Sequence, residues 1–167
     1  MTTPLFIDNL SFAKKQESLS GILNAANCER LTTLLQSNAK SNDKISYRLQ
    51  GETNSVAQHF LHLAIDANLT TICQRCLNEM TLELPLEFDY MLSDIGDVEV
   101  DEGDDFDHLN ISQSMDLIAL IEDEIITALP IAPMHEISAE NSQCALKVAS
   151  SGEKPNPFAA LKGLIKP

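Results

Sequence analysis

The chain contains no tryptophan, and aromatic residues make up only 5% of its 167 residues. Proteins that read single-stranded RNA by base stacking need exposed aromatic side chains for each stacked base. This scarcity argues against a stacking platform for RNA.

Long apolar runs are also absent. No stretch approaches the roughly 18 consecutive apolar residues of a membrane helix, and the segment from Met1 to Asp8 lacks the cationic start of a signal peptide. Four cysteines are too few for a disulfide scaffold in a chain of this length, and in the cytosol paired cysteines indicate metal or redox chemistry. We therefore expect a cytoplasmic protein that makes no membrane contact.

Positive charge is missing from the middle of the chain. Between Leu77 and Leu146 there are 18 acidic residues and no Lys or Arg, within a chain whose net charge is −14. Phosphate groups would be repelled by such a segment, so any RNA contact would have to use the N-terminal part or the tail. Taken alone, the charge distribution favours a protein partner.

The composition is that of a folded domain, with 44% hydrophobic and 22% charged residues. We expect one α+β domain over residues 1–146, a size that suits a single core, and a basic C-terminal arm over residues 147–167. Residues 93–107 contain eight acidic and no basic residues, so we expect them to form a solvated loop. Their spacing matches no EF-hand, which argues against a calcium site.

The clearest local pattern is a long antiparallel hairpin. Apolar residues alternate with polar ones over Leu61–Leu69 and again over Leu82–Phe88, and Cys73-Gln74-Arg75-Cys76 lies between these runs. The CxxC is therefore expected at the hairpin tip. Pro85 within the second run predicts an edge strand or a bulge.

Shorter strands are expected at Ser18–Leu23 and Ile45–Leu49, and helices at Ala25–Gln36 and Ser114–Leu129. The apolar stripe of the second helix is expected to pack on the hairpin sheet. Its acidic residues Glu122, Asp123 and Glu124 would then face away, either as a solvated face or as a partner surface. The expected fold class is an antiparallel sheet packed by at least two helices.

Three stretches in this order resemble the YceD family of large ribosomal RNA subunit accumulation proteins. They are Cys73 to Cys76, the block from Asp116 to His135, and Asn156 to Leu161. The resemblance implies a role in the synthesis, processing or stability of 23S ribosomal RNA. It implies no catalytic residue, and we expect a non-enzymatic protein. The family pattern places a Cys soon after the His, whereas here eight residues separate His135 from Cys144, so a shared site requires the intervening loop to fold back.

A metal site is one interpretation of the cysteine pair. Two thiolates at a hairpin tip have the form of a zinc knuckle, and His135 and Cys144 could complete a tetrahedral Zn²⁺ site with Cys73 and Cys76. The alternative is two reduced cysteines in a tight turn, with His135 hydrogen-bonded locally. Redox catalysis is less favoured, because Arg75 is the only cation near the pair and no helix N-terminus is expected there.

Direct RNA contact is a second hypothesis. Arg75 at the hairpin tip could form a modest basic patch together with Lys44 and Arg48 on the preceding strand and with Lys14 and Lys15 earlier in the chain. The arm adds four cations: Lys147, Lys154, Lys162 and Lys166. The alternative for each of these residues is ordinary surface charge.

Two functions remain open from the sequence. The first is a factor acting on 23S RNA or an early large-subunit assembly particle. The second is an acidic module that holds a basic ribosomal protein or RNA-processing factor without touching RNA.

Overall fold

The computed structural model describes residues 4–35, 43–94, 106–136 and 144. The expected arm over 147–167 and most of the expected acidic loop over 93–107 lie outside these residues. Within the described part, no helix combines the length and apolar content needed to cross a membrane.

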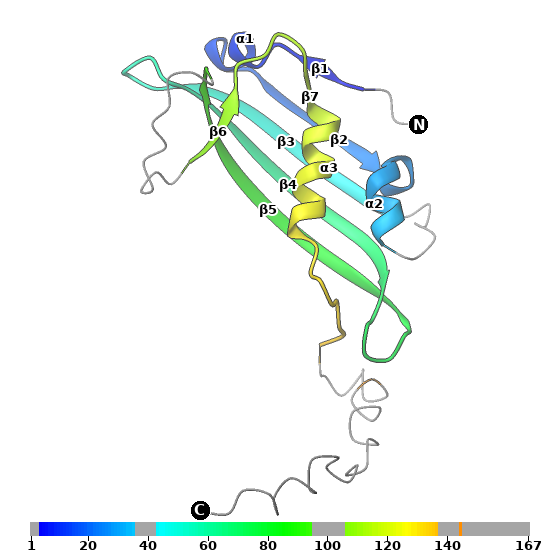
Figure 1. Cartoon of the computed structure of the whole chain (residues 1–167). Coiled ribbons are helices and arrows are strands. Elements are labelled where there is room, and N and C mark those ends of the chain that lie inside the picture. Colours follow the sequence, from blue (N-terminus) through cyan, green and yellow to red (C-terminus); the bar gives the residue numbers. More distant parts are fainter. Residues whose placement is uncertain (1–3, 36–42, 95–105, 137–143, 145–167) are drawn as a thin grey trace, which may run out of the picture.

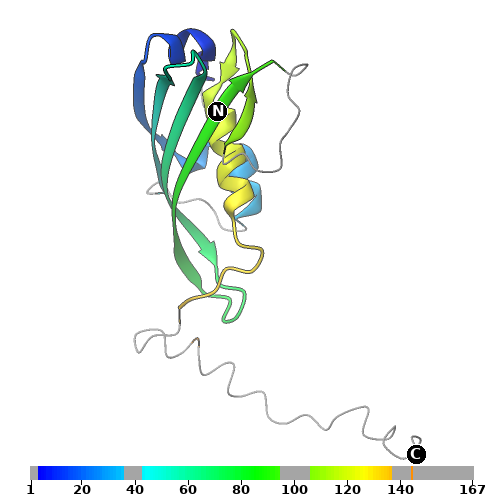
Figure 2. The same cartoon turned by 90° about the vertical axis from the view of Figure 1, so that its left-hand side faces the viewer.

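A five-stranded sheet forms the body of the protein, in the order β2-β3-β4-β5-β6 (Figure 1). Its strands are β2 (Ser18–Asn24), β3 (Lys44–Thr53), β4 (His59–Ile72), β5 (Glu79–Ser93) and β6 (Asp107–Asn110). Helices α2 (Glu29–Leu34) and α3 (Leu117–Ala128) cover the same side of this sheet (Figure 2). The remaining elements are β1 (Phe6–Ile7), α1 (Asn9–Lys14), a 3₁₀ turn η1 (Ala25–Asn27) and β7 (Met115–Asp116). The α+β class that the sequence predicts is confirmed.

The predicted hairpin is present as β4 and β5. Their antiparallel register runs from Phe60 opposite Met91 to Ile72 opposite Glu79, which leaves the CxxC in the connecting turn. Inward side chains of β4 pack beneath α3, whose Leu117, Ile121 and Ile125 are fully buried. The buried inward positions of β4 are Leu61, Leu63, Ile65, Ala67 and Leu69.

Pro85 lies on a sheet edge, as its sequence context predicts. On the side of β5 away from β4, β6 pairs only with Tyr90–Ser93, so within the described part of the chain Pro85 has a strand neighbour on one side alone. A proline is tolerated there because it has no N–H to donate to a ladder. The β5–β6 pair is parallel, which makes the sheet mostly rather than wholly antiparallel.

Both predicted helices are shorter than their periodicity suggests. The segment expected to form one helix over Ala25–Gln36 splits into η1 and α2, with Cys28 between them in an extended conformation. The second helix begins at Leu117 because the Asp116 carboxylate accepts hydrogen bonds from the N–H groups of Ile118 (3.0 Å) and Ala119 (3.3 Å). The short helix α1 has no counterpart among the elements expected from the sequence.

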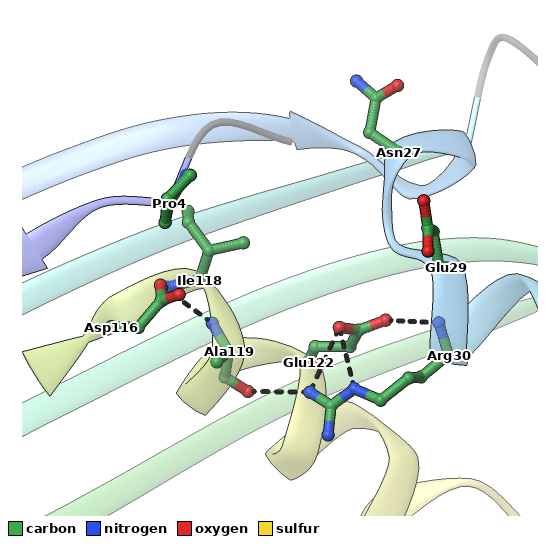
Figure 3. A pocket seen from close by; sticks show the side chains of 8 residues that line it. All are labelled: Pro4, Asn27, Glu29, Arg30, Asp116, Ile118, Ala119 and Glu122. Atoms are coloured by element: carbon green, nitrogen blue, oxygen red, sulfur yellow. Dashed lines mark hydrogen bonds and ion pairs between the residues drawn. The ribbon is translucent and has the colours of Figure 1, made fainter. Parts of the chain in front are cut away.

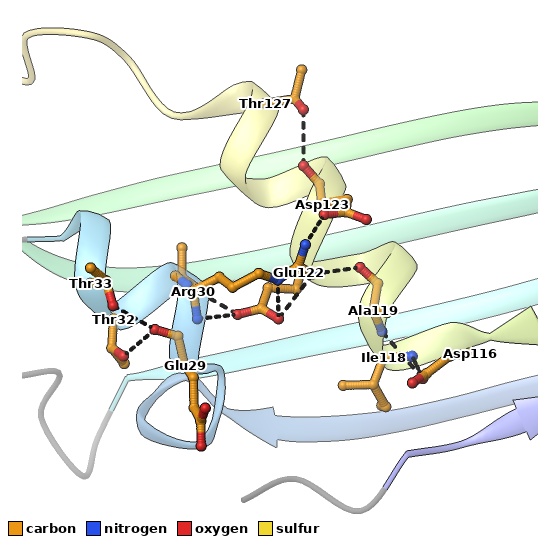
Figure 4. Close-up of polar contacts among 11 residues, drawn as sticks. Glu29, Arg30, Thr32, Thr33, Asp116, Ile118, Ala119, Glu122, Asp123 and Thr127 are labelled. Carbon is orange, nitrogen blue, oxygen red and sulfur yellow. Dashed lines mark hydrogen bonds and ion pairs between the residues drawn. The ribbon is translucent and has the colours of Figure 1, made fainter.

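Glu122 joins the two covering helices. Its Oε1 accepts hydrogen bonds from the backbone N–H groups of Arg30 (2.9 Å) and Leu31 (3.0 Å), at the N-terminus of α2. Its Oε2 accepts from the guanidinium of the same Arg30, which also pairs with Asp123 (Figure 4). Glu122 therefore caps a helix whose own N-cap residue, Cys28, makes no side-chain cap.

The expectation that Glu122, Asp123 and Glu124 form a solvated or partner-binding face holds for the exposed Asp123 but is wrong for Glu122. Glu122 is only 9% exposed, and Glu124 accepts a hydrogen bond of 2.7 Å from the Tyr90 hydroxyl. With Asp123 held by Arg30, all three carboxylates have partners within the chain. The periodicity of α3 placed them off the apolar stripe, but it gave no sign of α2 lying beside them.

We predict that Glu122→Ala lowers the free energy of unfolding by about 2 kcal/mol, because it leaves two helix N–H groups without their acceptor and removes one of the two carboxylates that bind the Arg30 guanidinium. Urea denaturation monitored by far-ultraviolet circular dichroism measures this change. The matched control is Asp123→Ala, which removes a surface ion pair and should cost less than about 1 kcal/mol. Equal losses in the two variants would contradict the capping role.

Candidate metal centre

The turn between β4 and β5 is closed by backbone hydrogen bonds. Cys73 N–H donates to the Asn78 carbonyl and Leu77 N–H donates to the Cys73 carbonyl, each at 2.9 Å. Leu77 adopts a left-handed conformation with φ of 63°, which reverses the chain directly after Cys76. This compact turn keeps the two cysteines of the CxxC close together.

The chain that follows α3 reaches the same turn. After the helix it runs toward the tip of the β4–β5 hairpin (Figure 1). Pro130 and Pro133 favour an extended path, and the Pro133 carbonyl accepts a hydrogen bond of 2.8 Å from Gln74 N–H. His135, two residues later, is thereby brought to the CxxC.

Four potential metal ligands meet at the hairpin tip. The ligand atoms of Cys73, Cys76, His135 and Cys144 all lie within 4.8 Å of one another. The Sγ atoms of Cys73 and Cys144 are 3.7 Å apart, and Cys76 Sγ lies 3.4 Å from His135 Nδ1. The three cysteines are buried, with Cys73 wholly inaccessible.

These distances fit a tetrahedral zinc site. With Zn–S bonds of about 2.3 Å and a Zn–N bond of about 2.0 Å, neighbouring sulfurs lie about 3.8 Å apart and a sulfur and nitrogen about 3.5 Å apart. Both observed separations agree with this geometry to within about 0.2 Å. The other separations among the three thiols and the imidazole are at most 4.8 Å, so the four side chains are close enough to share one metal ion.

Local hydrogen bonds favour the thiolate of Cys73. Burial alone would raise the pKa of Cys73, but the backbone N–H groups of Cys76, His135 and Arg75 bring it down to about 5. Burial and the neighbouring sulfurs of Cys73 and Cys76 raise the pKa of Cys144. The turn thus stabilises negative charge on sulfur, which is the form in which cysteine binds a metal.

Cys28 is different in kind. It lies in the main core between η1 and α2, away from the other three cysteines. Burial and the nearby Glu122 raise the pKa of its thiol to about 11. Cys28 is thus a neutral core residue.

The guanidinium of Arg75 contacts the cysteine cluster. Its Nη1 lies 3.8 Å from Cys144 Sγ and its Nη2 lies 3.5 Å from Met134 Sδ. The sequence leaves Arg75 either as an RNA contact or as ordinary surface charge. It does not predict the contact with Cys144, since no local pattern connects residues 69 positions apart. A cation at this place offsets the negative charge of thiolates.

The basic residues that the structure describes lie at different distances from Arg75. Lys14 and Lys15 stand at the end of α1, which packs against Gly51 and Thr53 at the opposite end of the sheet. Lys44 and Arg48 are exposed on β3, on the sheet face opposite the helices, level with Asn68 and Ala64 of β4. Arg48 lies roughly 25 Å along the sheet from the hairpin tip, at about 3.3 Å per residue. Lys147, Lys154, Lys162 and Lys166 lie outside the described residues.

A cleft of about 480 Å³ lies between the N-terminal ends of α2 and α3 (Figure 3). It is bordered by Arg30, Asp116 and Glu122. The Arg30 guanidinium is already occupied by Glu122 and Asp123, and Asp116 caps α3. These three polar side chains of the cleft therefore serve the fold.

His62 sits between two carboxylates on the open sheet face. Its Nδ1 contacts Asp89 Oδ1 at 2.5 Å, and its Nε2 contacts Glu52 Oε2 at 3.0 Å. Partial burial alone would lower the pKa of His62, but hydrogen bonds to Asp89 and Glu52 raise it above its usual value. The alternation of β4 places His62 on the outer face, whereas its partners depend on cross-strand register.

Comparison with known proteins gives two findings. A sequence model described as "Large ribosomal RNA subunit accumulation protein YceD" matches residues 61–165, which include the hairpin and all four potential metal ligands. A protein of that name from Haemophilus influenzae is 29% identical over 168 residues, spanning 96% of this chain and 95% of the relative. No solved structure matches the chain.

We predict that the stabilising contribution of His62 depends on pH. Because its pKa is higher in the folded state, the contribution is full below the unfolded value of about 6.5 and is lost as pH rises through the folded value. His62→Gln should therefore cost on the order of 0.5 kcal/mol at pH 6 and less at pH 8.5, measured by urea denaturation. Asp89→Asn should remove most of this pH dependence. A cost that grows with pH would contradict the assignment.

Proposed function

The chain belongs to the YceD family of large ribosomal RNA subunit accumulation proteins, and we propose on this basis that it supports the accumulation of 23S ribosomal RNA. The relative's near-complete coverage supports a shared role rather than a shared fragment. We propose that the protein acts as a non-enzymatic factor in the making of the large subunit. Ribosome assembly in bacteria takes place in the cytoplasm, so the protein would act there.

The structural feature on which we base a mechanism for this function is the Cys/His cluster at the hairpin tip. Thiolate and imidazole ligands in a tetrahedron select zinc over the oxygen-seeking cations. Four protein ligands leave no open coordination position, so a zinc ion here would be structural rather than catalytic. Cys73, Cys76, His135 and Cys144 would hold it.

Such a site would link segments that are distant in sequence. Cys73 and Cys144 are 71 residues apart, and Cys144 precedes the first arm lysine, Lys147, by three residues. The metal would therefore hold the start of the basic arm beside Arg75. We propose that this end of the protein contacts RNA, through Arg75 and the arm lysines.

A second candidate function is the binding of a basic ribosomal protein or RNA-processing factor. It is favoured by the exposed carboxylates of β5, a strand within the part of the chain that has no Lys or Arg. The two functions are compatible, because they use different parts of the molecule.

We predict about one zinc ion per chain in protein purified without a metal-affinity tag, measured by inductively coupled plasma mass spectrometry. Cys76→Ser should lower the zinc content several-fold, because three remaining ligands hold the ion less tightly. Cys28→Ala is the matched control, since it removes a buried thiol outside the cluster and should leave the zinc content unchanged. Folded protein that contains no zinc and takes up none would contradict the site.

We predict that cells lacking the protein have a lower ratio of 23S to 16S RNA and that the intact gene restores it. Ultraviolet crosslinking in cells should give 23S fragments, and these should decrease when Arg75 and the four arm lysines are replaced. In vitro, each lost phosphate contact should reduce the slope of log affinity against log salt by about 0.7 to 0.9.

Lys14→Gln/Lys15→Gln is the control for removed positive charge and should leave the crosslinks in place. A normal 23S to 16S ratio without the protein would exclude the proposed role. A reduced ratio with no crosslinks would instead favour the protein-binding function.

A further inference from the structure

The outer edge of β5 is unpaired over most of its length. β5 spans Glu79–Ser93, but its second neighbour β6 covers only Tyr90–Ser93. Among the described residues, no strand pairs with the outer side of Glu79–Asp89, which borders the sheet in Figure 1. Backbone N–H and C=O groups along such an edge can pair with an added strand.

The inner face of this edge has an incompletely covered apolar row. Leu82, Leu84 and Leu86 point toward the helix side of the sheet, and each is only partly buried. Their partners on β4, which are Leu69, Ala67 and Ile65, are at most 1% exposed. The core is therefore closed over β4 and open along β5, where another apolar strand could cover it.

The outer face of the same edge is acidic. Glu83 and Glu87 are exposed and lie level with the uncharged Asn68 and Ala64 of β4. In the described part of the chain, neither glutamate makes an ion pair. A second copy of β5 would bring like charges together, whereas a basic strand would find opposite charge at alternate positions.

Pro85 sets the direction of the free backbone groups. A proline on an edge strand turns its nitrogen outward, away from the ladder. Because backbone groups alternate along a strand, Glu83 and Glu87 also direct theirs outward. The outward backbone groups of Glu83 and Glu87 are thus available for hydrogen bonding on either side of Pro85, which has no N–H to donate.

We propose that the β5 edge binds an extended segment of a basic protein as an added strand, with Lys or Arg alternating with apolar residues. Apolar side chains of the segment would cover Leu82, Leu84 and Leu86, and its basic side chains would pair with Glu83 and Glu87. This is recognition by strand addition, in which the backbone gives affinity and alternate side chains give selectivity. The identity of the partner as a ribosomal protein or processing factor rests on the proposed function. The docking surface does not rest on it.

The test uses the full chain and a labelled, end-blocked ten-residue peptide that alternates Lys and Val. Fluorescence anisotropy should show saturable binding that Glu83→Gln/Glu87→Gln weakens about threefold to tenfold, as expected for two exposed ion pairs. The control Glu17→Gln/Glu29→Gln removes the same charge from other elements and should leave the affinity unchanged. A peptide of the same composition, with its Lys and Val residues in separate blocks, should bind at least tenfold more weakly.

Hydrogen–deuterium exchange tests the binding mode. Bound peptide should slow amide exchange within Glu79–Asp89, and peptides N-methylated on either all Lys or all Val residues should differ, because only one set blocks the paired edge. Equal binding by both methylated peptides, or equal weakening by both double variants, would overturn strand addition in favour of diffuse charge attraction. Protection of β5 by a single-stranded RNA of 20 nucleotides, rather than by the peptide, would also overturn it.

The cellular experiment separates this inference from the proposed function. A fall in 23S RNA without the protein, together with failure of the peptide to bind, leaves the family role standing and removes the β5 docking surface. Saturable, edge-specific peptide binding with normal 23S RNA supports the docking surface and removes the role in 23S accumulation.

Discussion

The structure depends first on the register between β4 and β5. Pairing continues from Phe60 opposite Met91 to Ile72 opposite Glu79, and it carries the two strands past the region that α2 and α3 cover. Because strand side chains alternate, this one register buries the apolar row of β4, exposes the acidic row of β5 and fixes the position of the CxxC turn. A shift by one residue would move every side chain of the strand to the opposite face of the sheet. It would therefore disrupt both the core and the candidate metal centre.

The second constraint is helix α3, which determines where the chain after it leads. Asp116 starts the helix where the small β1–β7 sheet ends, and its twelve residues advance about 18 Å along the main sheet toward the hairpin tip. Glu122 fixes its lateral position by binding the N-terminus of α2. Pro130 then prevents the helix from continuing, and the extended segment delivers His135 to the cysteines. The cluster is thus assembled by elements whose termini are set by local capping and by proline.

The features that could be predicted from the sequence are those that depend on interactions between residues close together in the chain. Period-2 alternation identified the hairpin, and helical periodicity identified the core face of α3. Pro85 itself indicated an edge strand or a bulge, of which the structure has the edge. The partners of Glu122 could not be predicted, because the contact joins Arg30 and Glu122 across 92 positions and neither has a distinctive neighbourhood. The same is true of Arg75 beside Cys144, and of His62 between Glu52 and Asp89. The four potential metal ligands were identifiable by type, since thiols and imidazole are scarce, but their convergence depended on the path after Pro130.

The last constraint is the distribution of positive charge around the hairpin tip. If the cluster bound a divalent ion, three thiolates and one imidazole around it would carry one net negative charge, and a buried charge of this kind would need a counter-charge nearby. The chain from Leu77 to Leu146 contains no Lys or Arg, so the second half of the domain has no cation for this purpose. Arg75, within the CxxC itself, is therefore the residue whose position allows it to compensate the cluster. Its guanidinium has five N–H donors and can contact a sulfur with one while directing others to solvent, so compensation of the cluster and contact with RNA do not exclude each other.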